Sequence, residues 1–104
     1  MTIQFNTDKN ITVSEKFDAA LTTLITSELT RFSDHITRLE VHISDENGGK
    51  EGPNDKRCMI EARLEGLQPI AVTSHGESPE HAVKVAVTKL KAALDTVVGR
   101  LKSH

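Results

Sequence analysis

Residues 37–75, TRLEVHISDENGGKEGPNDKRCMIEARLEGLQPIAVTSH, contain three runs in which apolar and polar residues alternate. Alternation with a period of two is typical of strands that have one buried and one solvated face. We therefore predict strands over 37–44, 57–66 and 69–75. The tight join through residues 65–68 predicts that the last two strands form an antiparallel hairpin. The side chains predicted to point inward are Leu39, Val41, Ile43, Cys58, Ile60, Ala62, Leu64, Ile70 and Val72.

The segment between the first two of these strands has the composition of a loop. Residues 45–55, DENGGKEGPND, are dense in Gly, Asn, Asp and Pro and include no apolar residue. Such a segment has no face to bury, and its residue types favour turns. We predict a flexible loop over about residues 45–56.

A segment with a different period precedes these strands. In residues 11–32, ITVSEKFDAALTTLITSELTRF, apolar residues recur every three or four positions, which predicts a helix with one buried face. Two residues fit the N-cap of this helix. Thr12 with Glu15 fits a capping box, and Ser14 is an equally good N-cap. Turn-prone residues after Phe32 mark its end. The predicted buried face consists of Phe17, Ala20, Leu21, Leu24, Ile25, Leu29 and Phe32.

The C-terminal segment predicts a second, longer helix. Ser78 is a good N-cap, Pro79 suits the first helical position, and Glu80 faces the positive end of the helix dipole. An apolar stripe from Val83 to Leu101 persists for about five turns. Glycine near the end of this helix, at residue 99, weakens it by about 1 kcal/mol relative to alanine.

With a short first strand over residues 2–6, these elements follow the order β-α-β-β-β-α. Each predicted strand has one polar face, so both helices should pack on the same side of one sheet. The first two strands should be parallel, joined by a right-handed crossover, and the remaining pairs antiparallel. The predicted fold is an α+β two-layer sandwich with a four-stranded mixed sheet. A chain of 104 residues supplies one core, so residues 1–104 are expected to form a single domain.

The composition excludes several classes of protein. Hydrophobic residues make up 37 % of the chain and charged residues 27 %, which is typical of a soluble globular domain. No apolar run approaches the roughly 20 residues that cross a bilayer. The N-terminal residues 1–10 lack the basic and apolar regions of a signal peptide. We therefore expect a cytoplasmic protein that does not enter a membrane.

No residue pattern indicates catalysis, a metal site or a cofactor. Cys58 is the only cysteine, which excludes an internal disulfide and a thiolate zinc cluster, and its strand phase predicts an inert thiol in the core. The five histidines lack the spacing of a metal site. Residues 47–52 contain glycines but precede a strand rather than a helix, unlike a phosphate-binding loop. We predict that the protein is not an enzyme and takes no small-molecule substrate.

Positive charge is concentrated near the C-terminus. The formal net charge is −2, yet residues 79–104 carry five bases and two acids. Such side chains can neutralise phosphates of a folded RNA without reading its sequence. From the residues alone, the favoured alternative is a solvated helix face, because lysines on outer faces are the norm. All three aromatic residues are Phe on core faces, so no exposed platform for stacking bases is predicted. The bases that project from the apolar stripe or flank it are Lys84, Lys91, Lys102, Lys89 and Arg100.

Two motifs, together with the order of the elements, resemble a known family. LTRFSDHI, residues 29–36, is similar to that family's leucine, basic residue, aromatic and histidine-isoleucine ending of the first helix. GESPEHAVKVAVTKL, residues 76–90, is similar to its last helix, where a glycine-acidic start leads to Ala-Val and then to Lys-Leu. The chain resembles, nearly end to end, the hibernation-promoting factor and ribosome-associated inhibitor family in its short form. These proteins are also catalogued as sigma-54 modulation proteins.

The resemblance implies a fold akin to a double-stranded RNA-binding domain and a non-enzymatic role. That role is to bind the small ribosomal subunit in the channel used by messenger and transfer RNA, which stops translation in stationary phase or stress. The implied partners are the small subunit and its ribosomal RNA. The residues expected to contact RNA are Lys84, Lys89, Lys91, Arg100 and Lys102, with Lys16 and Arg31 secondary.

The end of the last helix departs from the family pattern. Ala92, Thr96, Val97 and Val98 stand where family members carry mostly basic or polar residues. Fewer bases mean fewer phosphate contacts and weaker RNA binding. An alternative function is therefore a protein–protein interaction module that has kept the fold and lost most of its RNA-binding surface. One of the two valines is expected to be partly exposed, where it would support weak self-association.

Overall fold

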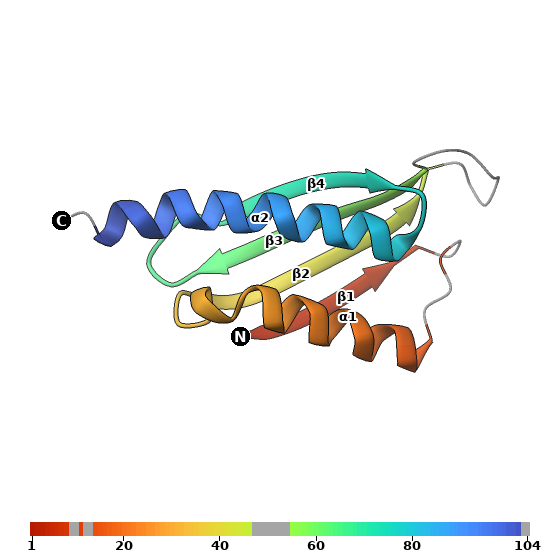
Figure 1. Cartoon of the computed structure of the whole chain (residues 1–104), viewed down its shortest axis with the longest axis horizontal. Helices are drawn as coiled ribbons and strands as arrows, with labels where there is room; N and C mark the ends of the chain where they lie inside the picture. The colour runs from red at the N-terminus through yellow and green to blue at the C-terminus, as the bar shows by residue number, and fades with distance from the viewer. Residues whose placement is uncertain (9–10, 12–13, 47–54, 103–104) are drawn as a thin grey trace.

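The predicted order of strands and helices is confirmed (Figure 1). The computed structural model describes residues 1–8, 11, 14–46 and 55–102, with side chains as far as residue 100. The elements are β1 (Thr2–Thr7), α1 (Glu15–Glu28), the 3₁₀ helix η1 (Thr30–Phe32), β2 (Ile36–Asp45), β3 (Lys56–Leu64), β4 (Ile70–Gly76) and α2 (Pro79–Lys102).

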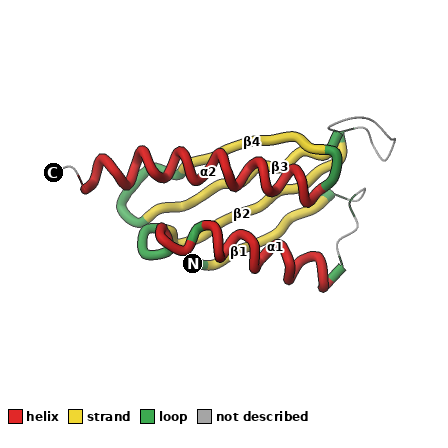
Figure 2. The backbone as a smooth tube through the Cα atoms, in the orientation of Figure 1, coloured by secondary structure: helices red, strands yellow, loops and turns green. Residues whose placement is uncertain are grey.

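The four strands form one mixed sheet in the order β1-β2-β3-β4. β1 and β2 are parallel, whereas β2 with β3 and β3 with β4 are antiparallel, as predicted. Both helices cover the same face of the sheet, with α1 on the β1 side and α2 on the β4 side (Figure 1 and Figure 2). The fold is therefore the α+β two-layer sandwich that the sequence predicts.

The core lies between the helix layer and the sheet. The strand register sets inward residues side by side, as with Ile3 beside Leu39 and Ile60 beside Val72. The predicted inward residues of β2 and β3 are all buried, whereas Ile70 and Val72 are half-buried because β4 is an edge strand. The large side chains that are fully buried include Leu21, Ile25, Leu29, Leu39, Ile43, Ile60, Leu90 and Leu94.

Ser14 caps the first helix. Its Oγ accepts a hydrogen bond from the Phe17 amide at 3.1 Å, which satisfies one of the unpaired amides at the helix start. Of the two predicted starts, the one at Ser14 is confirmed. Thr12, on which the other depends, lies outside the described residues.

Two predictions for the first helix were wrong. The α-helix ends at Glu28 rather than after Phe32, and η1 follows it. The tighter winding of a 3₁₀ turn lets both Leu29 and Phe32 reach the core. Ala20 is exposed rather than buried, because it lines a groove between α1 and α2 and not the helix–sheet interface.

The end of β4 holds the start of α2 closely. Ser78 Oγ accepts a hydrogen bond from the His81 amide at 3.1 Å, which confirms Ser78 as the cap. The buried Ser74 hydroxyl donates to the Ala82 carbonyl at 2.5 Å. A Cβ atom at Gly76 would come within 2.6 Å of the Ala82 nitrogen. The helix can lie this near to the strand because residue 76 has no side chain.

The segment predicted as a loop over about residues 45–56 begins at the end of β2 and finishes at the start of β3. Asp45 belongs to β2 and Lys56 to β3, and the Glu46 amide donates to the Asp55 carbonyl at 2.9 Å. The Lys56 ammonium lies 2.8 Å from the Asp55 carboxylate and 3.4 Å from that of Asp45. The hydrogen bond to Asp55 raises the pKa of Lys56. The remainder of the predicted loop, residues 47–54, lies outside the described residues.

The Cys58 thiol is buried, as its position in the strand predicts, and burial raises its pKa to about 12. At about pH 8 this lowers the thiolate fraction roughly a thousandfold relative to an exposed cysteine, and the thiolate is the reactive form. We expect an alkylating reagent to modify the native protein at least about a hundredfold more slowly than the urea-unfolded protein. Intact-mass spectrometry over time measures both rates. Equal rates would show that the thiol is accessible and reactive.

Candidate nucleic-acid interface

Two of the predicted RNA-contacting lysines lie on the side of α2 that faces α1. Lys84 lines the groove between the helices, and its ammonium lies 3.0 Å from Glu80, one turn earlier on α2. Lys91 reaches across to α1, where its ammonium lies 2.8 Å from the Glu28 carboxylate. Each of these lysines is therefore already paired with an acid.

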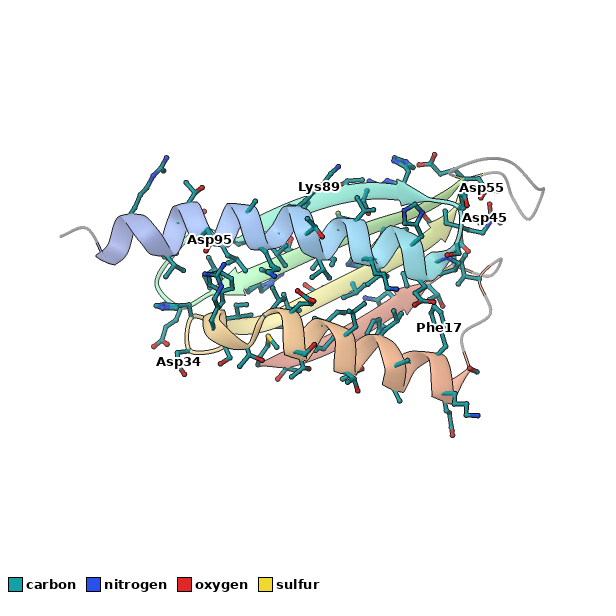
Figure 3. All side chains as sticks on the ribbon, viewed as in Figure 1. Phe17, Asp34, Asp45, Asp55, Lys89 and Asp95 are labelled. Carbon is teal, nitrogen blue, oxygen red and sulfur yellow. The ribbon has the colours of Figure 1, made fainter. Side chains whose placement is uncertain are left out.

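Arg31, from η1, joins the same side of the helix layer. Its guanidinium lies 2.7 Å and 2.8 Å from the two carboxylate oxygens of Asp95 on α2. Asp95 is labelled in Figure 3. The guanidinium also packs over the ring of Phe32, 4.5 Å from the centroid. Phe32 is itself buried, as predicted. Arg31 thus links α2 to the end of the first helical segment.

The other predicted bases lie apart from these three. Lys89 is on the opposite flank of α2, where its ammonium donates to the Thr73 carbonyl of β4 at 2.8 Å (Figure 3). The side chains of Lys16 and Arg100 are exposed, and neither has an ion-pair or hydrogen-bond partner among the described residues. Lys102 ends α2, with its side chain outside the described part of the chain. The predicted bases therefore do not converge on one cationic patch.

Acids and bases lie together where the two helices face each other. Along α2 the charged positions 80, 84, 91 and 95 are spaced by four, seven and four residues, so they lie on one stripe of the helix. Exposed ion pairs of this kind contribute at most about 1 kcal/mol, so a phosphate can displace the acid from its base. The members of this interhelical charge cluster are Arg31, Lys84, Lys91, Glu28, Glu80 and Asp95.

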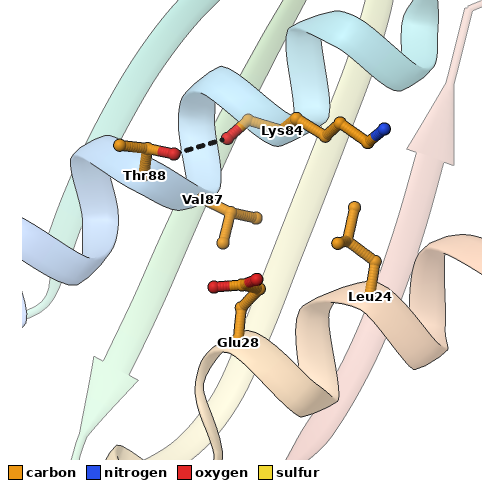
Figure 4. A pocket seen from close by; sticks show the side chains of 5 residues that line it. All are labelled: Leu24, Glu28, Lys84, Val87 and Thr88. Atoms are coloured by element: carbon orange, nitrogen blue, oxygen red, sulfur yellow. Dashed lines mark hydrogen bonds between the residues drawn. The ribbon is translucent and has the colours of Figure 1, made fainter.

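A groove lies beside the interhelical charge cluster. It has a volume of about 270 Å³ and is lined by the apolar Leu24 and Val87 and by Glu28, Lys84 and Thr88 (Figure 4). A neighbouring hollow toward the start of both helices is lined by Phe17, Ala20, Leu21, Leu24, Glu80 and Lys84. The interhelical side thus combines charge with a recessed surface, an arrangement that suits recognition by shape and charge.

Known proteins share both the sequence pattern and the fold of this chain. A family model described as sigma 54 modulation protein / S30EA ribosomal protein matches residues 5–102. The chain belongs to this family. The resemblance seen in the sequence is thereby confirmed over residues 5–102.

Two solved structures share the fold of this S30EA-family chain. The N-terminal domain of Protein Y from Thermus thermophilus is 18 % identical, with a TM-score of 0.72 over 93 % of this chain and 99 % of that one. A ribosomal subunit interface protein from Coxiella burnetii is 17 % identical, with a TM-score of 0.73 over 95 % of this chain and 99 % of that one. At these identities the likeness shows the fold. Sequence comparison with curated proteins finds no match.

Of the late positions of α2 where this S30EA-family chain departs from the family pattern, Ala92 and Thr96 are exposed and the two valines are packed. Val98 is buried, with 4 % of its surface exposed, and Val97 is half-buried against the core. The prediction that one of the two is partly exposed is confirmed for Val97. Among the described residues, Met1 is the one large hydrophobic residue that is exposed. The described residues therefore form no exposed apolar patch around Val97.

The open face of the sheet is charge-balanced as well. The Arg63 guanidinium lies 3.0 Å from Glu61 and 3.5 Å from Glu40, and the Arg38 guanidinium lies 3.7 Å from Glu40. These residues come from β2 and β3, which pair directly, so they form a ladder of charges across two strands. This face therefore does not offer the surplus of positive charge that phosphates attract.

Sequence reasoning missed the acids of the interhelical charge cluster. The Lys84–Glu80 pair has a sequence signal, since the residues lie one helical turn apart. The Lys91–Glu28 and Arg31–Asp95 pairs join residues 63 and 64 positions apart. No periodicity within one element could have revealed these two pairs.

Residues 1–8, 11, 14–46 and 55–102 contain no helix that is long and apolar enough to cross a membrane. No three His, Cys, Asp or Glu side chains in that part of the chain form a group that could hold a metal ion.

Proposed function

We propose that this chain is a non-enzymatic cytoplasmic protein that associates with the ribosome. It binds ribosomal RNA of the small subunit and inhibits translation in stress or stationary phase, as in ribosome hibernation. The observation that carries the proposal is the family match over residues 5–102. One structural neighbour is described as a ribosomal subunit interface protein, which supports the same partner.

The outer side of the helix layer is the surface that suits this role. Lys84 and Lys91 are seven residues apart, or about 10 Å along the helix axis, so they can contact separate phosphates. Arg31, from the first helical segment, extends the same contact surface, whereas Arg100 lies on another side of α2. Such a surface recognises folded RNA through backbone charge and shape. A protein bound in this way inhibits by occupancy, without any chemical step.

Sedimentation of a stationary-phase lysate through a sucrose gradient tests the proposal. At about 50 mM salt the protein is expected in the ribosomal fractions, and it should leave them as salt is raised, because phosphate contacts are salt-sensitive. Added to a translation reaction reconstituted from purified components, the protein should lower the rate of synthesis. A protein that stays at the top of the low-salt gradient would contradict ribosome association.

A second candidate function is a protein–protein interaction module. The acids that pair with Arg31, Lys84 and Lys91 favour it, as does the apolar lining of the neighbouring groove. Analytical ultracentrifugation of the pure protein distinguishes the two functions. A concentration-dependent dimer that is lost in Val97→Lys, together with no ribosome binding, would favour the module. Val98 is unsuitable for this substitution because it is buried.

A further inference from the structure

We propose that Glu28, Glu80 and Asp95 are selectivity residues of the RNA-binding surface. They hold three bases in ion pairs, so that generic polyanions bind poorly and only a partner that contacts several groups at once can displace them. This inference rests on the proposed function, because it concerns the same surface. It adds a role for acids in a site otherwise defined by its bases.

The positions of the three acids carry the inference. Each has a carboxylate oxygen between 2.7 Å and 3.0 Å from a different base of the interhelical charge cluster. Their side chains are 42 %, 57 % and 51 % exposed for Glu28, Glu80 and Asp95, so they face the same solvent as the bases. A phosphate that approaches any of these bases therefore meets a carboxylate at the same point.

The consequence for binding follows from counterion release. A polyanion binds mainly because bases replace the cations condensed on its phosphates, and each neutralised phosphate adds to the salt dependence. A base that is already paired must first lose its acid, and the freed carboxylate then repels the neighbouring phosphate. This penalty recurs at three places along the helix layer. It suppresses binding that rests on charge alone and spares a partner whose shape supplies further contacts, which is how repulsive elements produce specificity.

The sheet offers a matched comparison on the opposite side of the molecule. Glu40, Glu46 and Glu61 pair there with arginines, and Glu46 also lies 3.0 Å from His75. Neutralising these three acids changes the net charge by the same amount as neutralising the three acids of the cluster. The two variants thus share the change in net charge and differ in which face of the protein gains positive character.

The experiment compares two triple variants with the wild type. The cluster variant carries Glu28→Gln, Glu80→Gln and Asp95→Asn, and the sheet variant carries Glu40→Gln, Glu46→Gln and Glu61→Gln. Binding to fluorescently labelled poly(A) is followed by anisotropy over a salt series. We expect the cluster variant to bind at least about tenfold more tightly than wild type at about 50 mM salt, with a salt slope steeper by about 2. The sheet variant should stay within about twofold of wild type.

Two outcomes would overturn the inference. One is an equal gain in both triple variants, which would mean that net charge alone governs binding. The other is no gain in a cluster variant whose circular dichroism shows native helix content. If that variant does not fold, Glu28→Gln with Asp95→Asn leaves the start of α2 unchanged and should still show about two-thirds of the change in slope.

Ribosome binding by the wild type is measured separately, by sedimentation. Wild type absent from ribosomal fractions would contradict the proposed function, even where the cluster variant gains poly(A) binding. Wild type that sediments with ribosomes, together with a folded cluster variant that gains no poly(A) binding, would contradict the selectivity role alone. The two failures are therefore distinguishable.

Discussion

Replacing Gly76 with alanine is expected to lower the free energy of unfolding by about 3 kcal/mol. The new Cβ atom would meet the nitrogen and the Cα of Ala82 at 2.6 Å and 3.0 Å. These are backbone atoms, and the buried hydrogen bond from Ser74 holds them against β4. The clash can be relieved only by moving the start of α2, which would loosen its packing on β4 and β3.

Thermal unfolding followed by circular dichroism measures this effect. For a domain of this size, about 3 kcal/mol corresponds to a Tm lower by about 15 °C. Gly99→Ala is the matched control, because among the described residues no heavy atom beyond its chain neighbours and its own helix backbone lies within 4 Å of the new Cβ. Alanine is the better helix former by about 1 kcal/mol, so the control should raise Tm. Similar changes in both variants would contradict the close contact at Gly76.

Reversing the charges of Lys84 and Lys91 together is expected to weaken ribosome binding by at least about thirtyfold at about 100 mM salt. Each substitution to Glu removes a base and sets a second carboxylate beside Glu80 or Glu28. Both changes repel the phosphates that the two lysines would contact. Because two phosphate contacts are lost, the salt slope of the binding constant should also fall by about 2.

The matched control for this variant is Arg38→Glu with Arg63→Glu. It changes the net charge by the same amount on the open face of the sheet, away from the helix layer. We expect this control to bind ribosomes within about twofold of wild type. Co-sedimentation over a salt series measures both variants. Equal losses in both would mean that binding follows net charge and that the helix layer is not the interface.

The fold was predictable because its determinants are local. Alternating residues set the phase of β2 and β3, and the predicted inward residues Leu39 and Ile60 are indeed buried. Ser78 and Pro79 mark the start of α2 by the chemistry of a helix terminus alone. The errors fell where contacts between elements decide the outcome. Ala20 has the right helical phase for burial, but it faces a groove between the helices.

The candidate site was only half predictable. Residue type and helical phase identified the bases of α2, and Glu80 could be paired with Lys84 by spacing within one helix. Spacing within one helix could not identify the bases that pair with Asp95 and Glu28, since those partners lie on another element. Lys89 shows the same limit, because the Thr73 carbonyl that it contacts belongs to the neighbouring strand.

By itself, the sequence determined the order of the elements, the faces that they bury and the family to which the chain belongs. These follow from periodicity, from capping and from motifs that are each contained in one segment. The tertiary structure alone decided which charges meet. An ion pair such as Arg31 with Asp95 forms between residues 64 positions apart, and only the packing of both helices on one face of the sheet brings them within 3 Å. The charge of each residue is therefore a property of the sequence, whereas the cation that remains available to an RNA is a property of the fold.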